Sequence, residues 1–353
     1  MPGSKVERPR LDQPFVTGSI DTPAGSVPVV PAALTWRDRI GGCAVRWGIG
    51  RYTYTVDPGL YAVGSPDGTS PVLVTANYKL SFDALRRELP GRSAWVLVFD
   101  TRGINVWCAA GKRTFGTDEV VARVQKAGLS LIVSHQTLVL PQLGAPGVSA
   151  PEVRRRSGFR AVWGPVRAAD LPAFLDSGLR ATPEMRRVRF TTYDRLVLVP
   201  VEFVGSLGIG VGAAAASTLA GGIGPGWYSV PRALARAPLA VAAPLTAVVA
   251  GTLVTPLLLP WLRGRMFSAK GLQAGMLASI AVLLLAPAAT GWPDLLAAVA
   301  LILAGASFGA MNFTGASTYT SLHGVEKEMH LAMPWQIAGA AIATLLWIGG
   351  GWW

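Results

Sequence analysis

Five long apolar segments occupy the C-terminal half of the chain, and they constrain its fold more than any other feature. They lie at about residues 197–220, 238–261, 271–290, 294–313 and 331–353. A helix that crosses a bilayer needs about 20 apolar residues, and proline is tolerated in such helices. We therefore predict an all-α transmembrane domain of five helices over residues 191–353.

The charged residues are concentrated before this apolar region. Only 15% of the 353 residues are charged, against about 25% in soluble domains. Residues 1–195 hold 26 of the 32 Lys and Arg residues. A soluble, basic N-terminal part is therefore predicted to precede the membrane part. We attribute the excess positive charge near residues 186–195 to contact with membrane lipid rather than to nucleic acid.

The loops between the apolar segments predict how the chain is oriented. The loop 262–270 contains Arg263, Arg265 and Lys270, whereas the short turn 290–293 contains no Lys or Arg. Cytoplasmic loops are enriched in Lys and Arg. The pattern predicts a multi-pass protein of the cytoplasmic (inner) membrane, with the N-terminal domain in the cytoplasm and the C-terminus outside.

The N-terminal half predicts a flexible lead followed by an α/β domain. Residues 1–35 contain six prolines and suggest the lead. Residues 36–190 alternate between strand and helix patterns, which predicts a Rossmann-like α/β domain with a largely parallel sheet. The expected strands are 51–56, 71–76, 94–100, 129–134, 159–163 and 195–200, and the expected helices are 81–89, 117–127 and 168–177. Ligands collect at the carboxyl ends of parallel strands.

The segment after the predicted strand 94–100 is the strongest candidate site. Asn105 can cap a helix that begins at Val106. Cys108 would then lie in the first turn, where free backbone N–H groups favour a thiolate. Lys112 follows one turn later, and the intervening Ala109, Ala110 and Gly111 would let a broad, flat group approach. Cys108 is thus a candidate ligand or nucleophile, the alternative being a small buried apolar residue.

Other candidates carry weaker signals. Thr75 and Asn77 end a predicted strand, where they could bind the edge of a cofactor or be ordinary strand-end residues. Gln142, Gly144 and Gly147 lie in a Gly/Pro loop that could pass close to a cofactor or be a plain surface turn. Cys43 is interpreted as structural, and His135 is the one histidine that could pair with Cys108. The chain lacks CxxC and HExxH motifs.

One motif resembles a known family closely. The sequence Asn105-Val-Trp-Cys-Ala-Ala-Gly-Lys112 resembles the cap-helix motif of the HgcA family, the membrane-bound corrinoid proteins of mercury methylation. Residues 58–64, 70–78 and 140–147 are similar to corrinoid-domain segments of the same family and, more distantly, to the corrinoid iron–sulfur protein of the acetyl-CoA pathway. Residues 311–315 and the five apolar segments resemble the membrane domain of the first family.

The resemblance implies a cobalamin whose cobalt takes Cys108 as its lower axial ligand. The cofactor-binding residues it implies are Asn105, Val106, Trp107, Cys108, Ala109, Ala110, Gly111 and Lys112, and the weaker candidates Thr75, Asn77, Gln142, Gly144 and Gly147 join them. Trp107 could pack on the macrocycle or fill the core, and we favour the core. Thiolate is a soft donor that would favour departure of the methyl group as a carbanion equivalent.

The implied activity is a corrinoid-dependent methyltransferase that passes methyl from cobalt to Hg(II) and forms methylmercury. Its implied partners are a ferredoxin-like protein with iron–sulfur clusters (HgcB type), which supplies two electrons per methyl group, and a methyl-folate-type donor. The alternative is a membrane-anchored corrinoid methyl carrier of one-carbon metabolism, of the acetyl-CoA pathway type. A third reading, a membrane-anchored thiol redox sensor, requires no cobalt.

Overall fold

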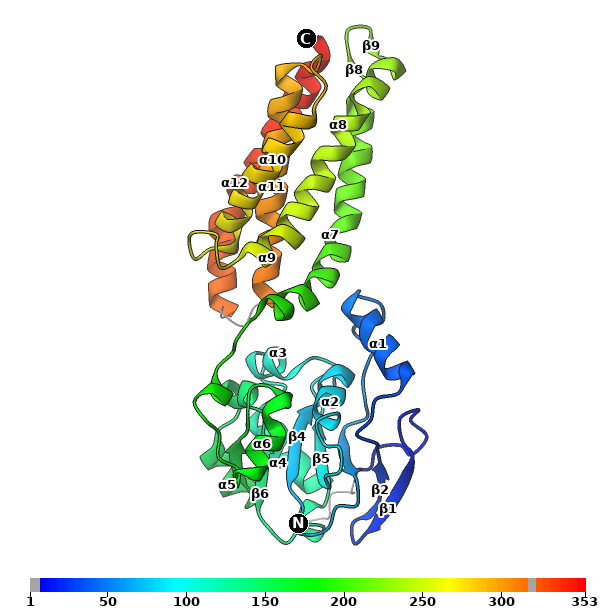
Figure 1. Ribbon diagram of the computed structural model, residues 1–353, viewed down its shortest axis with the longest axis vertical. Coiled ribbons are helices and arrows are strands. Elements are labelled where there is room, and N and C mark those ends of the chain that lie inside the picture. Colours follow the sequence, from blue (N-terminus) through cyan, green and yellow to red (C-terminus); the bar gives the residue numbers. More distant parts are fainter. Residues whose placement is uncertain (1–6, 317–321) are drawn as a thin grey trace. The chain divides into compact units, whose positions relative to one another are not determined.

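A computed structural model describes residues 7–316 and 322–353, so residues 1–6 of the predicted lead lie outside the described residues. The chain divides into two compact units. The first comprises Met1–Val45 and Ile49–Arg189, and the second comprises Arg46–Gly48 and Phe190–Trp353. The first unit contains the sheet, and the second contains the long helices (Figure 1).

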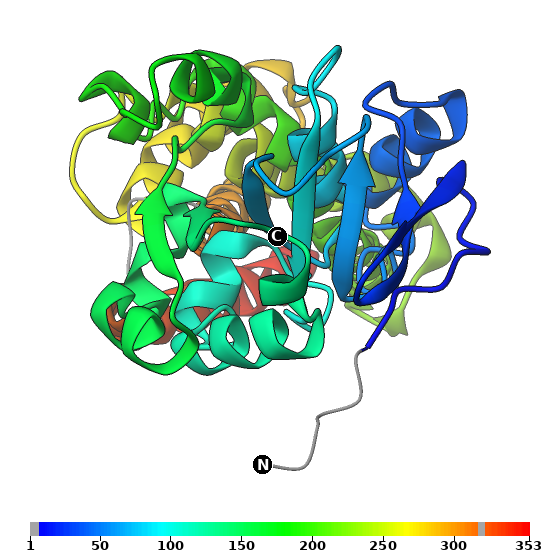
Figure 2. The same cartoon turned by 90° about the horizontal axis from the view of Figure 1, so that it is seen from below.

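A seven-stranded sheet forms the centre of the first unit, with the order β1-β2-β3-β5-β4-β6-β7. Strands β5, β4, β6 and β7 run parallel, β3 is antiparallel to β5, and β1 and β2 form a hairpin at one edge (Figure 2). The strands are β1 (Gly18–Thr22), β2 (Gly25–Val29), β3 (Gly59–Val63), β4 (Val72–Ala76), β5 (Ala94–Phe99), β6 (Thr137–Leu140) and β7 (Arg160–Trp163). The central strands read as continuous apolar runs because both of their faces are buried.

Helices cover both faces of this sheet. Phe82 of α2 and Phe174 of α6 belong to the core on one face. Ala109 of α3, Val120 of α4 and Val153 of α5 belong to the core on the other. The helices are α1 (Trp36–Arg46), α2 (Lys79–Arg86), α3 (Val106–Gly111), α4 (Thr117–Lys126), α5 (Ala150–Ser157) and α6 (Leu171–Asp176). The predicted α/β class is confirmed, and the sheet is mixed, with four parallel strands at its core.

The structure corrects the predicted flexible lead at residues 7–35. This segment supplies β1 and β2, and Val29 pairs with Ala62 of β3. The guanidinium of Arg86 also donates to the carbonyl oxygens of Pro31 and Ala33. The prolines of this segment suggest a flexible lead. A strand at the edge of a sheet nevertheless tolerates proline, because the backbone N–H groups on its outer side need no partner strand.

Three predicted strands are wrong. Residues 51–56 form a turn with one isolated bridge at Thr55, and residues 129–131 form a 3-10 helix. Residues 195–200 lie inside the first long helix of the second unit. The β-branched residues at these positions favour strands only weakly, so local context decides.

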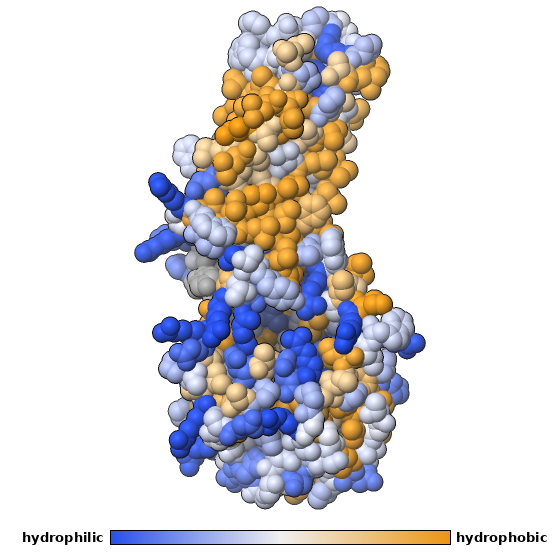
Figure 3. Space-filling model, in the orientation of Figure 1, coloured by the Kyte–Doolittle hydropathy of each residue, from blue (hydrophilic) through white to orange (hydrophobic). Residues whose placement is uncertain are grey.

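Within the described residues, the second unit contains five helices long and apolar enough to cross a membrane, as the sequence predicts. The spans are Thr192–Ala220, Val230–Leu258, Phe267–Leu285, Trp292–Asn312 and His323–Trp352. In helix labels these are α7 (Thr192–Ala220), α8 (Val230–Val249) continued through a π-helical turn (Ala250–Val254) into α9 (Thr255–Leu258), α10 (Phe267–Leu285), α11 (Trp292–Asn312) and α12 (Leu322–Gly349). Apolar side chains dominate the visible surface of these helices (Figure 3).

Several span boundaries differ from the prediction. Helix α7 begins at Thr192 rather than near residue 197, because Thr191 and Asp194 form a reciprocal capping box there. The hydroxyl of Thr191 accepts from the Asp194 N–H, and the Asp194 carboxylate accepts from the Thr191 N–H. Hydropathy alone misses these residues because a cap is polar.

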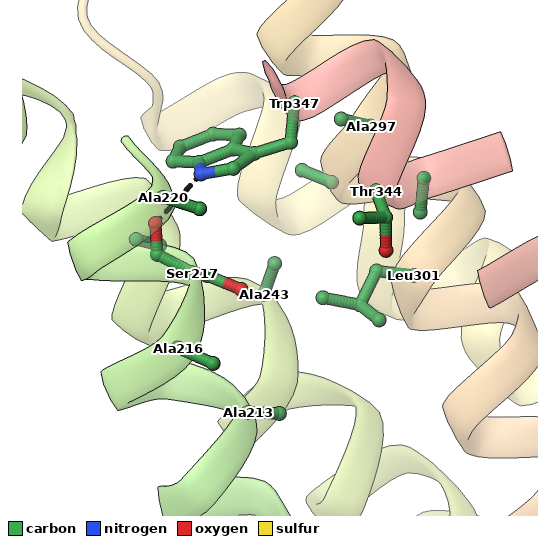
Figure 4. Close-up of a pocket in the computed structure, with 12 residues that line it drawn as sticks. Ala213, Ala216, Ser217, Ala220, Ala243, Ala297, Leu301, Thr344 and Trp347 are labelled. Atoms are coloured by element: carbon green, nitrogen blue, oxygen red, sulfur yellow. Dashed lines mark hydrogen bonds between the residues drawn. The ribbon is translucent and has the colours of Figure 1, made fainter. Parts of the chain in front are cut away.

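An ion pair and a small cavity mark the interior of the second unit. Arg236 of α8 pairs with Asp294 of α11, and its guanidinium lies 4.1 Å from the ring centroid of Trp347. A cavity of about 230 Å³ lies among α7, α8, α11 and α12. Alanines line most of it, and the indole N–H of Trp347 donates to the Ser217 carbonyl oxygen at its rim (Figure 4). The pairing of Arg236 with Asp294 satisfies two charges that would otherwise be costly between apolar helices.

Candidate functional site at the carboxyl edge of the sheet

The candidate residues gather where the parallel strands end. The chain leaves β4 at Asn77, β5 at Asp100 and β6 at Pro141. These strands run in the same direction, so their carboxyl ends share one edge of the sheet. Thr75, Asn77, the 105–112 segment and Gln142, Gly144 and Gly147 therefore lie along one edge, as the strand pattern predicts.

The helix that carries Cys108 begins where the sequence indicates. The Asn105 side-chain oxygen accepts from the backbone N–H of Cys108 at 2.9 Å, and α3 starts at Val106. The carbonyl oxygen of Cys108 accepts from the Lys112 N–H at 3.0 Å. Both backbone groups of Cys108 are thus held, while its side chain is half-exposed.

The turn that leads into α3 is held by Asn77. Its side-chain oxygen accepts from the N–H of Thr101 at 3.1 Å, from the Thr101 hydroxyl at 2.8 Å and from the N–H of Gly103 at 3.0 Å. Gly103 adopts a left-handed conformation with φ of 71°, which suits glycine. Asn77 therefore positions the approach to α3, which differs from the predicted contact with a cofactor edge.

The Gly/Pro loop forms a 3-10 helix (Gln142–Gly147) that packs directly against α3. A Cβ at Gly144 would lie 2.5 Å from the Phe115 ring, and a Cβ at Gly147 would lie 3.1 Å from the Ala110 Cα and collide with the Phe115 carbonyl oxygen. The side-chain oxygen of Gln142 accepts from Arg186 at 2.9 Å. The two glycines thus allow the loop to pack closely against α3 and Phe115, so the loop is not a plain surface turn.

The two faces of α3 differ sharply. Val106, Ala109 and Ala110 are buried in the core, whereas Gly111 and Lys112 are exposed. The small size of Ala109 and Ala110 therefore permits the approach of the 142–147 loop, not of an outside group. Trp107 is half-exposed and lies outside the core clusters, so the core role we favour for it is wrong. The open side of α3 presents Trp107, Cys108 and Gly111, and nothing lies within 4 Å of a Cβ built at Gly111.

A cavity of about 200 Å³ adjoins α3 at this edge. Its wall is mainly apolar and includes Val106 of α3, Thr75 of β4 and the Gly164-Pro165 turn after β7. Thr75 is only 3% exposed, and it is one of the few polar residues of this wall.

Sequence reasoning misses part of this wall. Ser81, Ala84 and Leu85 come from α2, and Val166 and Leu171 come from the segment before and at the start of α6. The apolar positions of α2 indicate a buried face, but no local signal tells which of them border a cavity. Thr101, fully buried beside Asn77, was detectable because it directly follows a predicted strand.

The alternative chemistries find no support among the described residues. His135 begins the β6 segment, at the opposite edge of the sheet from Cys108, and backbone groups of Ser70 and Thr137 contact its two ring nitrogens. A Cys108–His135 pair is therefore excluded. Cys43 is exposed on α1, contrary to the structural role predicted for it. No group of three or more His, Cys, Asp and Glu side chains that could hold a metal occurs in the described parts of the chain.

Comparison with known proteins identifies relatives of this region. Residues 47–165 match the family model of the CO dehydrogenase/acetyl-CoA synthase delta subunit. This match contains the strands β3 to β7, α3 and the 142–147 loop. It ends before the long helices of the second unit, so it concerns the sheet and its carboxyl edge alone.

Individual relatives agree with the family match. The gamma subunit of the acetyl-CoA decarbonylase/synthase complex of Methanopyrus kandleri is 32% identical over 123 residues, or 34% of this chain and 26% of the relative. The gamma 2 subunit from Methanosarcina thermophila is 33% identical over 130 residues, or 36% of this chain and 27% of the relative. The chain thus spans about a quarter of the length of these relatives. The part of the chain that carries α3, within residues 47–165, is therefore similar to a subunit of the CO dehydrogenase/acetyl-CoA synthase type.

Proposed function

We propose that the first unit binds a corrinoid at the carboxyl edge of its sheet and that the protein is a membrane-anchored carrier of corrinoid-bound methyl groups. The observation that carries the proposal is the placement of half-exposed Cys108 on α3, next to a cavity, inside the segment related to acetyl-CoA decarbonylase/synthase gamma subunits. Both the site and the kinship therefore fall on the same 119-residue stretch, residues 47–165.

The residues at this edge fit a corrinoid. The cavity wall is mainly apolar, which suits the body of a corrin ring, and Thr75 in this wall could bind a polar group at its edge. The cavity is smaller than the roughly 300–1,000 Å³ typical of sites for drug-sized ligands, so it would hold only part of the group. The open side of α3, with Trp107, Cys108 and Gly111, would contact the remainder. When bound, a corrinoid supplies a cobalt that accepts and donates methyl groups.

Cys108 is the residue that would bind the cobalt. Sulfur is a soft donor suited to a polarizable transition metal. The side-chain oxygen of Asn105 accepts a hydrogen bond from the Cys108 N–H, and Asn77 holds the preceding turn. The thiol would therefore be oriented by groups that do not themselves contact the metal. Such supporting contacts set the orientation of a ligand. Val106, Ala109 and Ala110 support α3 from the core side.

The methyl acceptor separates two forms of this function. The kinship with acetyl-CoA decarbonylase/synthase subunits favours a methyl carrier of one-carbon metabolism, whose partners would be subunits of such a complex and a methyl-folate-type donor. The second candidate is methyl transfer to Hg(II) with a ferredoxin-like iron–sulfur protein (HgcB type) as electron donor. Cys108 and the flanking motif that resembles the HgcA family favour it.

We also propose the membrane orientation that the loop charges predict, with the N-terminal domain in the cytoplasm. Arg263 and Arg265 lie between the second and third spans, and Lys270 lies in the first turn of the third. They would face the cytoplasm together with the first unit, and the C-terminus would lie outside.

The decisive experiment uses the full chain, purified in detergent without oxygen after supply of cobalamin. Wild type, Cys108→Ala and the matched control Cys43→Ala are compared for cobalt content and visible absorption. We expect cobalt in all three and a shifted spectrum in Cys108→Ala alone. Identical spectra would contradict ligation by Cys108, and folded protein without cobalt would contradict corrinoid binding.

A second assay separates the two acceptors. The cobalamin-loaded protein turns over with a methyl donor and a low-potential reductant, and the electrons consumed per methyl group transferred are counted with either Hg(II) or a thiol nucleophile as the acceptor. Two electrons per methyl group, with methylmercury as the product, support transfer to Hg(II). Methyl transfer to a nucleophile with no net electron demand supports the one-carbon carrier.

A further inference from the structure

Helix α1 exposes the apolar side that a helix normally buries. Trp36 is 66% exposed and Ile40 is 59% exposed, and Cys43 is exposed as well. At 3.6 residues per turn these three positions fall within about 60° of one another on the helix. The opposite face of α1 buries Asp38, Gly42 and Val45. The helix therefore places a charged residue inward and an apolar stripe outward, the reverse of the usual arrangement.

A buried charge cluster fixes this orientation. Asp38 of α1 contacts Lys79 at 2.7 Å and Arg86 at 2.9 Å, and both cations also contact Asp83 of α2 at 2.8 Å. All four side chains are at most 7% exposed. Rotating α1 to bury its apolar stripe would expose Asp38 and leave Lys79 and Arg86 with one carboxylate between them.

The turn after α1 extends the apolar surface. Ile49 is 68% exposed and Tyr52 is 83% exposed. We call Trp36, Ile40, Cys43, Ile49 and Tyr52 the outward stripe. In the sequence, Trp47 continues the spacing of Trp36, Ile40 and Cys43 by one further turn.

Cations border the outward stripe. Arg37 and Arg39 lie on either side of it along α1 and are exposed, and Arg51 is half-exposed in the following turn. None of the three forms an ion pair with a described residue, and the Arg37 guanidinium lies 5.6 Å from the Trp36 ring centroid. Exposed aromatic and apolar side chains edged by unpaired arginines are typical of helices that lie in a membrane interface.

We propose that the outward stripe lies in the interfacial layer of a bilayer that contains anionic lipid. Trp and Tyr favour the headgroup level, and the arginines complement negatively charged headgroups. A bilayer is close at hand because the same chain contains five membrane-length helices. This surface therefore attaches the first unit to the membrane independently of the spans. The inference does not depend on corrinoid binding.

The test uses the full chain reconstituted in nanodiscs with one chain each, which excludes contact with a second copy. Cys43 carries an environment-sensitive fluorophore in a Cys108→Ser background, and the lipids carry a quencher near the headgroup end of the acyl chain. The matched control carries the fluorophore at Ser134→Cys, with both native cysteines changed to serine, because Ser134 is exposed near the amino end of β6. We expect Cys43 to be quenched several-fold more than position 134.

Two variants keep the result interpretable. Ile40→Glu changes an exposed side chain, so the fold is retained and quenching at Cys43 falls toward the control. The double variant Arg37→Gln and Arg39→Gln removes the difference between discs with and without phosphatidylglycerol. Equal quenching at Cys43 and position 134 in both lipids would overturn the proposal, as would quenching at Cys43 that Ile40→Glu leaves unchanged.

Discussion

At the scale of single residues, the site depends on side chains that hold α3 rather than on those that face outward. Asn77 accepts three hydrogen bonds within one turn, and Asn105 accepts the N–H of Cys108. Neither of these contacts involves the Cys108 side chain. The residue that is exposed to a ligand, Cys108, therefore differs from the residues that hold its helix in position, Asn77 and Asn105.

Asn77→Ala should lower stability more than Asn105→Ala. The first change leaves the buried Thr101 N–H and hydroxyl and the Gly103 N–H without their acceptor, at about 1–3 kcal/mol for a buried unsatisfied group. Loss of the Asn105 cap costs about 1 kcal/mol. Thermal melting of the full chain, followed by fluorescence, measures both. An equal effect of the two variants would contradict the central role of Asn77.

A comparison of two glycines tests the packing of α3. Gly147→Ala places a Cβ against the Phe115 carbonyl oxygen and 3.1 Å from the Ala110 Cα, whereas nothing lies within 4 Å of a Cβ at Gly111. Overpacking of this kind costs about 1–3 kcal/mol. Gly147→Ala should therefore lower the melting temperature and the cobalt content of cobalamin-loaded protein, and Gly111→Ala should retain the stability of wild type. Tolerance of Gly147→Ala would show that the loop can shift without cost.

At the scale of elements, local signals gave accurate predictions and packing did not. The cap at Asn105 and the five apolar helices follow from short stretches of sequence. The face of α3 that would be buried could not be read this way, because it depends on the 142–147 loop. The hairpin β1–β2 was missed because it is stabilised by β3, which is distant in the sequence.

The packing of α1 against the rest of the first unit should weaken at acidic pH. Burial alone would raise the pKa of Asp38, but hydrogen bonds from Lys79 and Thr35 outweigh it and hold the pKa well below the ordinary value of 3.8. A lowered pKa contributes stability that is present above pH 3.8 and is lost as the pH falls further. Melting temperatures measured between pH 3 and pH 7 should therefore fall only at the acidic end.

Asp38→Asn should remove much of that acid dependence and lower stability at pH 7 by about 3 kcal/mol, because it leaves Lys79 and Arg86 short of a carboxylate. The matched control is Asp176→Asn, which breaks an exposed pair with Arg92. Such surface pairs contribute little to stability, because water and salt screen them. Equal losses in the two variants would show that the buried cluster does not anchor α1.

At the scale of the whole molecule, the chain joins an α/β unit related to acetyl-CoA decarbonylase/synthase subunits to five membrane-length helices. The family match ends at residue 165, so the five membrane-length helices lie outside it. These helices are thus additional to the part of the chain that matches the family.

The proposed orientation is testable with the native cysteines. In intact cells, a membrane-impermeant maleimide should label Trp353→Cys in a background with Cys43 and Cys108 changed to serine. It should not reach Cys43 in a Cys108→Ser background until the cells are lysed, because the first unit would face the cytoplasm. Labelling of Cys43 in intact cells would contradict the proposed orientation.

The backbone of Cys108 has a further consequence. Its N–H is bound by Asn105 and its carbonyl oxygen by Lys112, while its side chain stays half-exposed. A different side chain at position 108 would lie at the same place on α3 and face the same direction. The chemistry offered at this position could therefore change in evolution by exchange of a single codon, because the backbone hydrogen bonds that hold position 108 do not involve its side chain.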